Sequence, residues 1–285
     1  MFAVAVLVLI GVVGLLLGGL FRKRAGPPDP REPRGGVAMI VGGGIVLPVV
    51  VLTGLLFLIL TTAMNVRGGG EGDPLRIEVA GYQWWWSVRY PEQGAVTANE
   101  IHIPVGRPIE LALTSVDVIH SFWVPELQGK VDMIPGQTNV LHLEASEPGV
   151  YRGQCAEFCG IQHANMAFHV IAEEPTAFET WAQTQAEDRV PPEGLAQDGE
   201  GVFLSKSCRT CHTVRGTPAT GETGPDLTHV MSRRWLAAGT IENSREHMAR
   251  WIAAPQQIKH GNYMPSVALT DDEMAALLAY LYSLE

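Results

Sequence analysis

Hydrophobic residues gather in two long runs near the start of the chain, at positions 2–20 and 37–63, and neither run contains a charged residue. About 20 apolar residues suffice for a helix to cross the hydrocarbon core of a bilayer. The second run is longer and can span with some tilt. The pattern therefore predicts two transmembrane helices, at 1–21 and 37–64, that form a hairpin around a loop at 22–36.

The loop between the two runs predicts which side of the membrane holds the rest of the chain. Its basic residues outnumber its acidic ones: Arg22, Lys23, Arg24, Arg31 and Arg34 against Asp29 and Glu32. Short loops rich in Lys and Arg stay cytoplasmic, so both chain ends are expected outside. A cleaved signal peptide is the alternative for the first run, but a charged start and a small-residue cleavage site are both missing.

Beyond a Gly-rich connector at 65–73, the period of the hydrophobic pattern changes to two. Apolar and polar residues alternate from Leu75, and the same alternation returns around Ile109 and Leu141. This period is typical of half-buried strands. Short strands separated by Gly and Pro turns predict an all-β domain at 74–173, a β-sandwich or a Greek-key barrel.

The remainder of the chain is predicted to be helical. Segment 174–194 mixes charges, a Pro-Pro pair and a short possible helix around Trp181, so it is expected to be a linker. Near the end of the chain, Thr270 and Glu273 fit a capping box and are followed by apolar residues at helical spacing. We therefore expect a small all-α domain at 195–285.

Charge and cysteine content limit what these domains can do. The formal net charge of −10 argues against a nucleic-acid partner, because a phosphate-binding surface needs clustered Lys and Arg. The four cysteines form two close pairs, Cys155 with Cys159 and Cys208 with Cys211. Disulfides are the simplest interpretation outside the cytoplasm. Each pair, however, lies inside a longer metal- or haem-binding pattern, and no cysteine is left over.

The first pair belongs to a segment dense in metal ligands. Between Cys155 and Met166 the chain carries two thiols, the imidazole of His163 and a thioether. Soft sulfur combined with imidazole favours copper. Because Cys155 and Cys159 are four residues apart, both thiolates can face one pocket and bridge two metal ions. A zinc site and a disulfide are the alternatives.

A second imidazole has to come from elsewhere in the chain. His120 follows a predicted strand, where the chain can bend toward the cysteine segment, and is the preferred candidate. His102, His142 and His169 stay open, because a lone histidine is more often hydrogen-bonded or solvated than bound to a metal.

The second pair of cysteines opens a haem-attachment signature. The sequence Cys208-Arg-Thr-Cys-His212 has the C-x-x-C-H pattern of c-type haem proteins. Cysteines three residues apart on a helical turn can meet the two vinyl groups of a haem, and the imidazole of His212 can then lie over the iron.

The context of this signature resembles class I cytochromes c. Gly224-Pro-Asp-Leu227 and Asn262-Tyr-Met-Pro265 follow it, and the resemblance implies Met264 as the second axial ligand. A Met/His pair raises the haem potential into a range suited to passing electrons onward. The rivals for the axial position are Met231, Met248, His247 and His260.

The copper segment resembles that of a respiratory family. The pattern is similar to the CuA centre of subunit II of haem-copper cytochrome c oxidases, and its residues are His120, Cys155, Glu157, Cys159, His163 and Met166. The predicted hairpin fits that subunit, and the resemblance implies a cupredoxin-like Greek-key fold for the all-β domain. The chain as a whole resembles a subunit II with a fused C-terminal class I cytochrome c domain.

This resemblance implies a role for each residue. Two thiolates, Cys155 and Cys159, would bridge both coppers, and two imidazoles, His120 and His163, would ligate one copper each. Met166 would be a weak ligand. Glu157 would offer its backbone carbonyl to copper, and its side chain would reach a magnesium ion at the junction with subunit I.

An aromatic segment, Gly81-Tyr-Gln-Trp-Trp-Trp-Ser87, is also similar to the family's. The resemblance implies that Trp84, the first tryptophan after the glutamine, is where electrons enter the copper domain. Core packing is the alternative, because aromatic residues commonly fill a sandwich. The family usually has His at the position of Tyr82, a difference expected to matter little.

The implied function is electron transfer within a respiratory cytochrome c oxidase. Electrons would pass from haem c to CuA and on to a haem of subunit I, where oxygen is reduced to water with proton translocation. The implied partners are subunit I, subunit III, an external electron donor and membrane lipid, in a bacterial plasma membrane with the copper and haem domains on its periplasmic face. In many relatives a glutamate near the position of Val41 opens a proton channel; Glu32 is the nearest carboxylate here.

Two other classes of function remain open from the sequence. The first is the corresponding subunit of a related reductase. A CuA-containing nitric oxide reductase would fit, whereas nitrous oxide reductase tends to have Trp at the position of Glu157 and no hairpin. The second is a membrane-tethered copper-binding or delivery module, although such sites usually hold one copper and need no haem.

Overall fold

The computed structural model describes residues 2–22, 34–67 and 72–285, and the chain divides into two units, Met1–Val66 and Arg67–Glu285. The first unit is helical. Its elements are α1 (Phe2–Phe21), α2 (Arg34–Val41), the π-helical turn η1 (Gly42–Val46) and α3 (Leu47–Arg67). Three consecutive glycines at the start of η1 lower the preference for a regular α-helix there.

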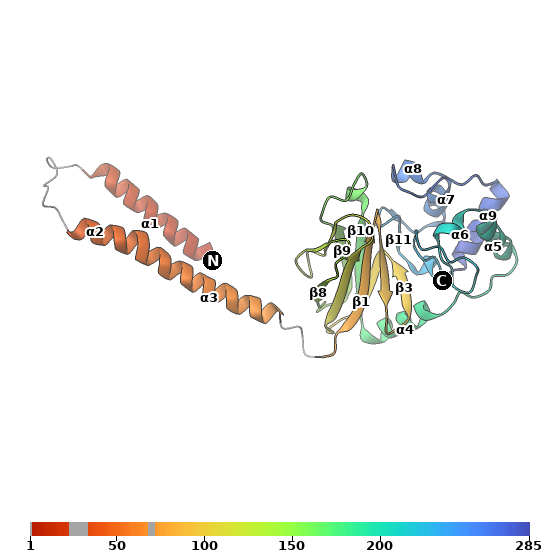
Figure 1. Ribbon diagram of the computed structural model, residues 1–285, viewed down its shortest axis with the longest axis horizontal. Coiled ribbons are helices and arrows are strands. Elements are labelled where there is room, and N and C mark those ends of the chain that lie inside the picture. The colour runs from red at the N-terminus through yellow and green to blue at the C-terminus, as the bar shows by residue number, and fades with distance from the viewer. Residues whose placement is uncertain (1, 23–33, 68–71) are drawn as a thin grey trace. The chain divides into compact units, whose positions relative to one another are not determined.

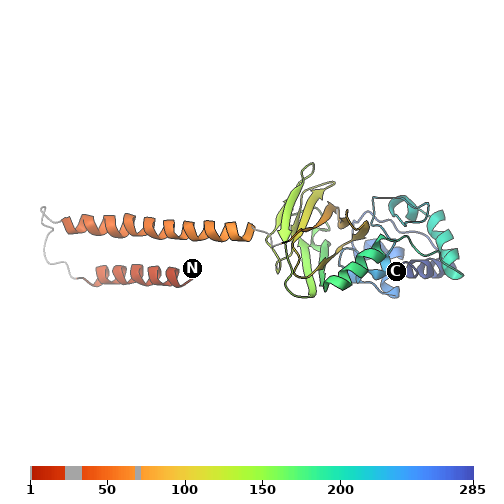
Figure 2. The ribbon, with the colours of Figure 1, turned by 90° about the horizontal axis from the view of Figure 1, so that it is seen from below.

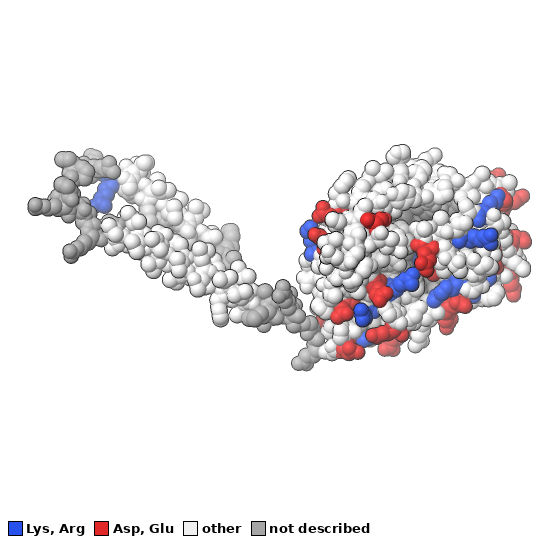
Figure 3. Space-filling view, in the orientation of Figure 1, with Lys and Arg blue, Asp and Glu red and all other residues white. Residues whose placement is uncertain are grey.

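One stretch of this unit is long and apolar enough to cross a membrane, within the part of the chain that the structure describes. It covers 26 residues, Val37–Thr62, and none of its most apolar window is buried against protein. The apolar part of α1, Ala5–Phe21, is shorter. Figure 3 shows these helices as almost free of charged side chains. One span is therefore found, and the second span of the predicted hairpin stays a prediction.

Part of the predicted loop and connector lies outside the described residues. This applies to Lys23, Arg24, Asp29, Arg31 and Glu32 of the loop, and to 68–71 of the connector. The prediction that this loop is cytoplasmic therefore rests on the sequence alone. The same holds for proton uptake at Glu32.

The second unit begins with two five-stranded sheets (Figure 1). The first has the order β3-β2-β1-β5-β8 and the second β4-β10-β9-β6-β7. The strands of the first sheet are β1 (Leu75–Tyr82), β2 (Trp85–Tyr90), β3 (Ala95–Ala98), β5 (Ile109–Ser115) and β8 (Asn139–Leu143). Those of the second are β4 (Glu100–Pro104), β6 (His120–Trp123), β7 (Val131–Met133), β9 (Gly149–Cys155) and β10 (Ala167–Glu173). Two pairs, β1 with β5 and β4 with β10, are parallel, and the other pairs are antiparallel.

Alternating burial explains why these segments form strands. In β1, Leu75, Ile77 and Val79 are at most 1% exposed, whereas the two residues between them face outward. Side chains that alternate in this way can bury one face of a sheet against the other. The strands predicted at Leu75, Ile109 and Leu141, and the all-β sandwich they imply, are confirmed.

The segment expected as a linker, 174–194, differs from that expectation. Most of it forms the helix α4 (Pro175–Ala186), which packs against β3 and β4 (Figure 2). Phe178 on this helix is buried, and the ring of Trp181 stacks on His102 with centroids 4.0 Å apart. The possible helix around Trp181 is thus a packed part of the sandwich, and only 187–194 connects the two domains as a linker.

The rest of the unit is a small domain dominated by helices. They are α5 (Leu195–Ser205), α6 (Cys208–Cys211), α7 (Arg245–Ala253), α8 (Pro255–Ile258) and α9 (Asp271–Tyr282), with the 3-10 turn η3 (Val230–Ser232). The domain also contains a two-stranded ladder of β11 (Trp235–Leu236) and β12 (Ile241–Glu242), which the all-α prediction did not include. The capping box is confirmed: the hydroxyl of Thr270 accepts from Glu273 N, and the Glu273 carboxylate accepts from Thr270 N.

The crossing of α5 and α9 generates a prediction. A methyl group on Gly199 of α5 would lie 2.0 Å from the carbonyl oxygen of Ala276 on α9, whereas Gly201 on the same helix has nothing within 4 Å. We expect Gly199→Ala to lower the free energy of unfolding by about 1–3 kcal/mol, because the backbone has to move apart. Gly201→Ala should leave it unchanged or raise it by up to ~1 kcal/mol, because Ala is the better helix former. Urea titration of the full chain, followed by ellipticity, measures both; equal effects would contradict this crossing.

Candidate copper and haem sites

The predicted copper ligands meet at one end of the second sheet. His120 begins β6, Cys155 ends the neighbouring β9, and the chain then loops through Cys159. His163 opens the 3-10 turn η2 (His163–Asn165), and Met166 directly precedes β10, which pairs with β9. Adjacent strands therefore hold both ends of the loop that carries most of the ligands.

The donor atoms of these residues lie close together. Cys155 Sγ is 3.7 Å from Cys159 Sγ and 3.8 Å from His120 Nδ1. Cys159 Sγ is 3.7 Å from both His163 Nδ1 and Met166 Sδ. The cysteines are free, and His120 groups with Cys155 and Cys159 as residues that could hold a metal ion. Two thiols, two imidazoles and one thioether form a soft donor set that fits copper.

The two thiols shift each other's pKa in opposite directions. The hydrogen bond between them lowers the pKa of Cys155, with a further contribution from His120, and the same bond raises the pKa of Cys159. Like charges at this distance repel, so the second thiol keeps its proton unless a cation offsets the charge. Bound metal ions supply that offset and deprotonate a coordinating thiol.

His120 is oriented by a carboxylate that the sequence did not single out. Asp117 Oδ1 lies 2.9 Å from His120 Nε2, which leaves Nδ1 facing Cys155. The other oxygen of Asp117 accepts from the backbone N–H of Gln83 at 2.7 Å. Such carboxylate–imidazole pairs fix the tautomer and ring orientation of a metal ligand. The signal in the sequence was only an acid three residues before the histidine.

The other three histidines considered as second imidazole lie elsewhere. His102 contacts the carboxylates of Glu100 and Glu173. His169 stacks on Trp235 with ring centroids 3.7 Å apart, and His142 lies on the outward-facing side of β8. The structure therefore brings His120, and none of these three, to the cysteines.

Glu157 presents its main chain and side chain in different directions. Its carbonyl oxygen is 3.2 Å from Cys155 Sγ, within the ligand cluster. Its side chain is 45% exposed and lies 3.8 Å from the ammonium group of Lys130. The carbonyl can serve a copper ion, while the carboxylate is free to meet an ion or a partner outside the domain.

Trp84 touches the copper loop directly. It lies in the turn between β1 and β2 and is 6% exposed. Its indole N–H donates to the carbonyl oxygen of Cys159 at 3.0 Å, and the side-chain amide of Gln83 donates to the same oxygen at 2.7 Å. The indole therefore holds the backbone of Cys159, a predicted copper ligand, in place, which core packing alone would not require.

The haem-attachment signature forms one helical turn followed by His212. Cys208 and Cys211 are the first and last residues of this turn, α6, and both are free cysteines. His212 Nδ1 donates to the carbonyl oxygen of Pro225 at 2.7 Å, and burial lowers the pKa of this imidazole. A neutral ring whose Nδ1 is fixed in this way has Nε2 available for iron. Gly224 leaves room for the ring, because an added Cβ would lie 2.7 Å from its Cε1.

Met264 packs against the same apolar cluster as Cys208. Its backbone is held by Asn262, whose side-chain oxygen accepts from Met264 N at 2.8 Å. Among its rivals, Met248 is 3% exposed and His247 contacts the carbonyl of Glu242. Met231 packs against the same cluster, so the axial role of Met264 stays a prediction from the sequence.

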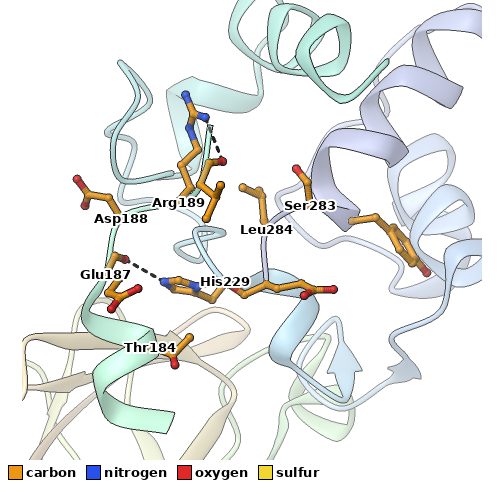
Figure 4. Close-up of a pocket in the computed structure, with 10 residues that line it drawn as sticks. Thr184, Glu187, Asp188, Arg189, His229, Ser283 and Leu284 are labelled. Atoms are coloured by element: carbon orange, nitrogen blue, oxygen red, sulfur yellow. Dashed lines mark hydrogen bonds between the residues drawn. The ribbon is translucent and has the colours of Figure 1, made fainter. Parts of the chain in front are cut away.

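A cavity of about 460 Å³ lies away from both sites (Figure 4). Its walls come from the end of α4, segment 187–190 and the end of α9, together with His229, whose Nε2 is 3.0 Å from the carbonyl of Glu187. None of the predicted copper or haem ligands lines it. The cavity therefore lies where segment 187–190 and residues 282–285 come together.

Comparison with known proteins finds two family matches along the chain. The family "Cytochrome C oxidase subunit II, periplasmic domain" matches residues 95–173, and the family "Cytochrome c" matches residues 196–285. Cytochrome c oxidase subunit 2 of Alkalihalophilus pseudofirmus is 37% identical over 99% of this chain and 84% of its own length. Its counterpart in Bacillus subtilis is 33% identical over 85% of this chain and 70% of its own. The solved periplasmic domain of subunit II of cytochrome oxidase from Bradyrhizobium japonicum is 34% identical and covers 39% of this chain and 92% of that one, with a TM-score of 0.38.

The contact of Asp117 with His120 generates a prediction for metal binding. Asp117→Asn keeps the shape but removes the charge that orients the imidazole, so copper affinity should fall about 10–100-fold. Competitive titration of the full chain with a copper chelator measures the change. Glu126→Gln, at an exposed position in the turn after β6, is the matched control and should bind as wild type. An unchanged affinity in Asp117→Asn would refute the orienting role.

Proposed function

The chain belongs to the cytochrome c oxidase subunit 2 family, and from this premise we propose that it is the electron-receiving subunit of a bacterial respiratory oxidase. Membership makes it a component of a haem-copper oxidase, an oxidoreductase, and implies a copper centre, a haem c and a subunit I partner. When bound, the haem and the copper pair supply a one-electron relay from an external donor to a haem of subunit I, where oxygen is reduced to water and the complex translocates protons.

The observation that carries this proposal is the convergence of five soft ligands at one end of the sandwich. Cys155 and Cys159 would hold the copper pair through their sulfur atoms, which lie 3.7 Å apart. His120 stands beside Cys155, and His163 and Met166 stand beside Cys159, so one imidazole belongs to each half of the site. A site for one copper would not need both thiolates.

The carbonyl of Glu157 completes the copper site in this proposal, and its carboxylate holds a magnesium ion at the junction with subunit I. The support is that the carbonyl lies within the cluster while the carboxylate is half-exposed and meets only the flexible Lys130. A long lysine side chain can move aside when a partner docks.

On the haem side, Cys208 and Cys211 would hold the haem covalently, and His212 and Met264 would be its iron ligands. The support is the placement of both thiols on one helical turn and the fixed Nδ1 of His212. Buried surroundings and hydrogen bonds to the ligands set the potential of such a site. No bond is made or broken in this subunit; its residues position and tune.

The membrane arrangement in this proposal has two spans, α1 and the helix from α2 through α3, with the loop at 22–36 in the cytoplasm. The copper and haem domains then lie on the periplasmic side of the plasma membrane, in contact with lipid only through the helices. Subunit III and an external electron donor complete the set of partners. Relatives have a glutamate for proton uptake near the position of Val41, and in this proposal Glu32 is the candidate to replace it.

Removing one bridging sulfur tests the two-copper assignment. Cys159→Ser should abolish the delocalised two-copper signal in electron paramagnetic resonance, because serine oxygen does not replace a thiolate bridge. The haem spectrum, which depends on the other domain, should stay unchanged and serves as the internal control. Fully copper-loaded wild-type protein without a two-copper signal would contradict the proposal.

The metal of the partner separates an oxidase from a related reductase. Subunit I that copurifies with this chain should contain copper beside its haem, as oxygen reduction requires. Metal analysis that finds non-haem iron in its place would favour a nitric oxide reductase instead.

A further inference from the structure

A short segment of the haem domain lies directly on the copper loop. The ammonium group of Lys259, 3% exposed, donates to the carbonyl oxygen of Trp84 at 2.8 Å. The side-chain amide of Gln162, in the copper loop, donates to the carbonyl oxygen of His260 at 2.6 Å. The side chain of Ile161 lies over Gly261, where an added Cβ would be 2.1 Å from Cδ1. Segment 259–263 therefore contacts the copper loop and the turn that contains Trp84.

Tyr263 ends this segment and covers Trp84. The two rings stack with centroids 5.3 Å apart and planes inclined by 21°. The tyrosine hydroxyl donates to Gln83 Oε1 at 3.0 Å, and the amide of Gln83 donates in turn to the carbonyl oxygen of Cys159. Trp84 is only 6% exposed, whereas Tyr263 is 72% exposed.

These contacts join the two cofactor-binding regions by an unbroken path. Tyr263 is the chain neighbour of Met264, the predicted axial ligand. From Tyr263 the path crosses one ring stack to Trp84 and one hydrogen bond to Cys159, a predicted copper ligand. Aromatic stacks and hydrogen bonds are direct contacts, so no gap interrupts the path.

We propose that Tyr263 is a positioning residue that couples the haem domain to the copper loop through Trp84 and closes Trp84 to any external carrier. The inference rests on the proposed function. With both cofactors bound, a ferrous haem would give up one electron along this contact and the copper pair would gain it, with no bond or proton moved. The external electron-transfer protein therefore docks on the haem domain and not on the copper domain.

A purely structural role for Tyr263 would have a different signature. A side chain that is largely exposed contributes little apolar burial, so its loss should barely change stability. Its stack with Trp84 is what distinguishes it from other exposed residues of this surface. A conservative aromatic replacement should therefore preserve the coupling, and an aliphatic one should not.

The test uses the intact oxidase complex with both cofactors loaded. Photoreduction of the haem followed by copper absorbance gives the rate of electron transfer between the two domains. Tyr263→Leu should slow it about tenfold, equivalent to about 1.4 kcal/mol of activation free energy, with both midpoint potentials unchanged. Tyr263→Phe keeps the ring and should restore the wild-type rate. Ile161→Ala removes another contact of the same surface and is the matched control.

A second readout does not depend on turnover. Hydroxyl-radical footprinting with mass spectrometry should show Trp84 protected in wild type and in Tyr263→Phe, and oxidised several-fold more in Tyr263→Leu. A wild-type rate and unchanged protection in Tyr263→Leu, with normal copper and haem spectra, would overturn the inference and leave the proposed function standing. An equal loss in Ile161→Ala would overturn it too, because any disturbance of the surface would then suffice. Missing copper or haem signals in wild type would instead remove the proposed function.

Discussion

The carbonyl oxygen of Cys159 is the acceptor around which the copper end of the sandwich is organised. Trp84 and Gln83 both donate to it, from a turn far away in the sequence. The loop between β9 and η2 is therefore held from the first sheet as well as by its own strands. Because electron transfer is faster when the ligands rearrange little, a loop fixed by a buried indole suits this site better than one held by its own turn.

The position of the haem domain follows from buried polar contacts that tolerate little displacement. Glu100 is 1% exposed, and one of its oxygens accepts from the backbone N–H groups of Arg234 and Trp235 at 2.7 and 3.1 Å. Arg233, 6% exposed, donates to Thr97 across the same boundary at 3.3 Å. A shifted domain would leave a buried charge without these partners, which costs several kcal/mol, on the order of 3–5. These contacts therefore fix the position of the haem domain on the sandwich, and with it the residues that lie against Trp84.

Local patterns in the sequence predicted the elements and the ligands, and failed where contacts are long-range. Alternation at Leu75 and the capping box at Thr270 depend on neighbouring residues, and both are found. Helix α4 was expected to be part of a linker because charges and a Pro-Pro pair follow it closely, and nothing local marks Phe178 as buried. Glu100 carries no motif, because only the fold brings its partners Arg234 and Trp235 near. Asp117 lies three residues before His120, a spacing too common to single it out. The second membrane span and the axial role of Met264 rest on sequence still.

Fusion of a haem domain to a copper domain can act by tethering or by fixed contact, and the contacts here argue for the second. A flexible linker raises the effective concentration of a donor to about the millimolar range and leaves docking as a separate step. In this chain α4 packs on the sandwich and leaves only 187–194 between the domains, while Lys259 and Gln162 hold the haem domain on the copper loop. The donor is therefore already docked, and encounter no longer limits the internal step. Under the proposal above, an outside partner meets the surface of the haem domain, and the residues that would select it lie there and not around Trp84.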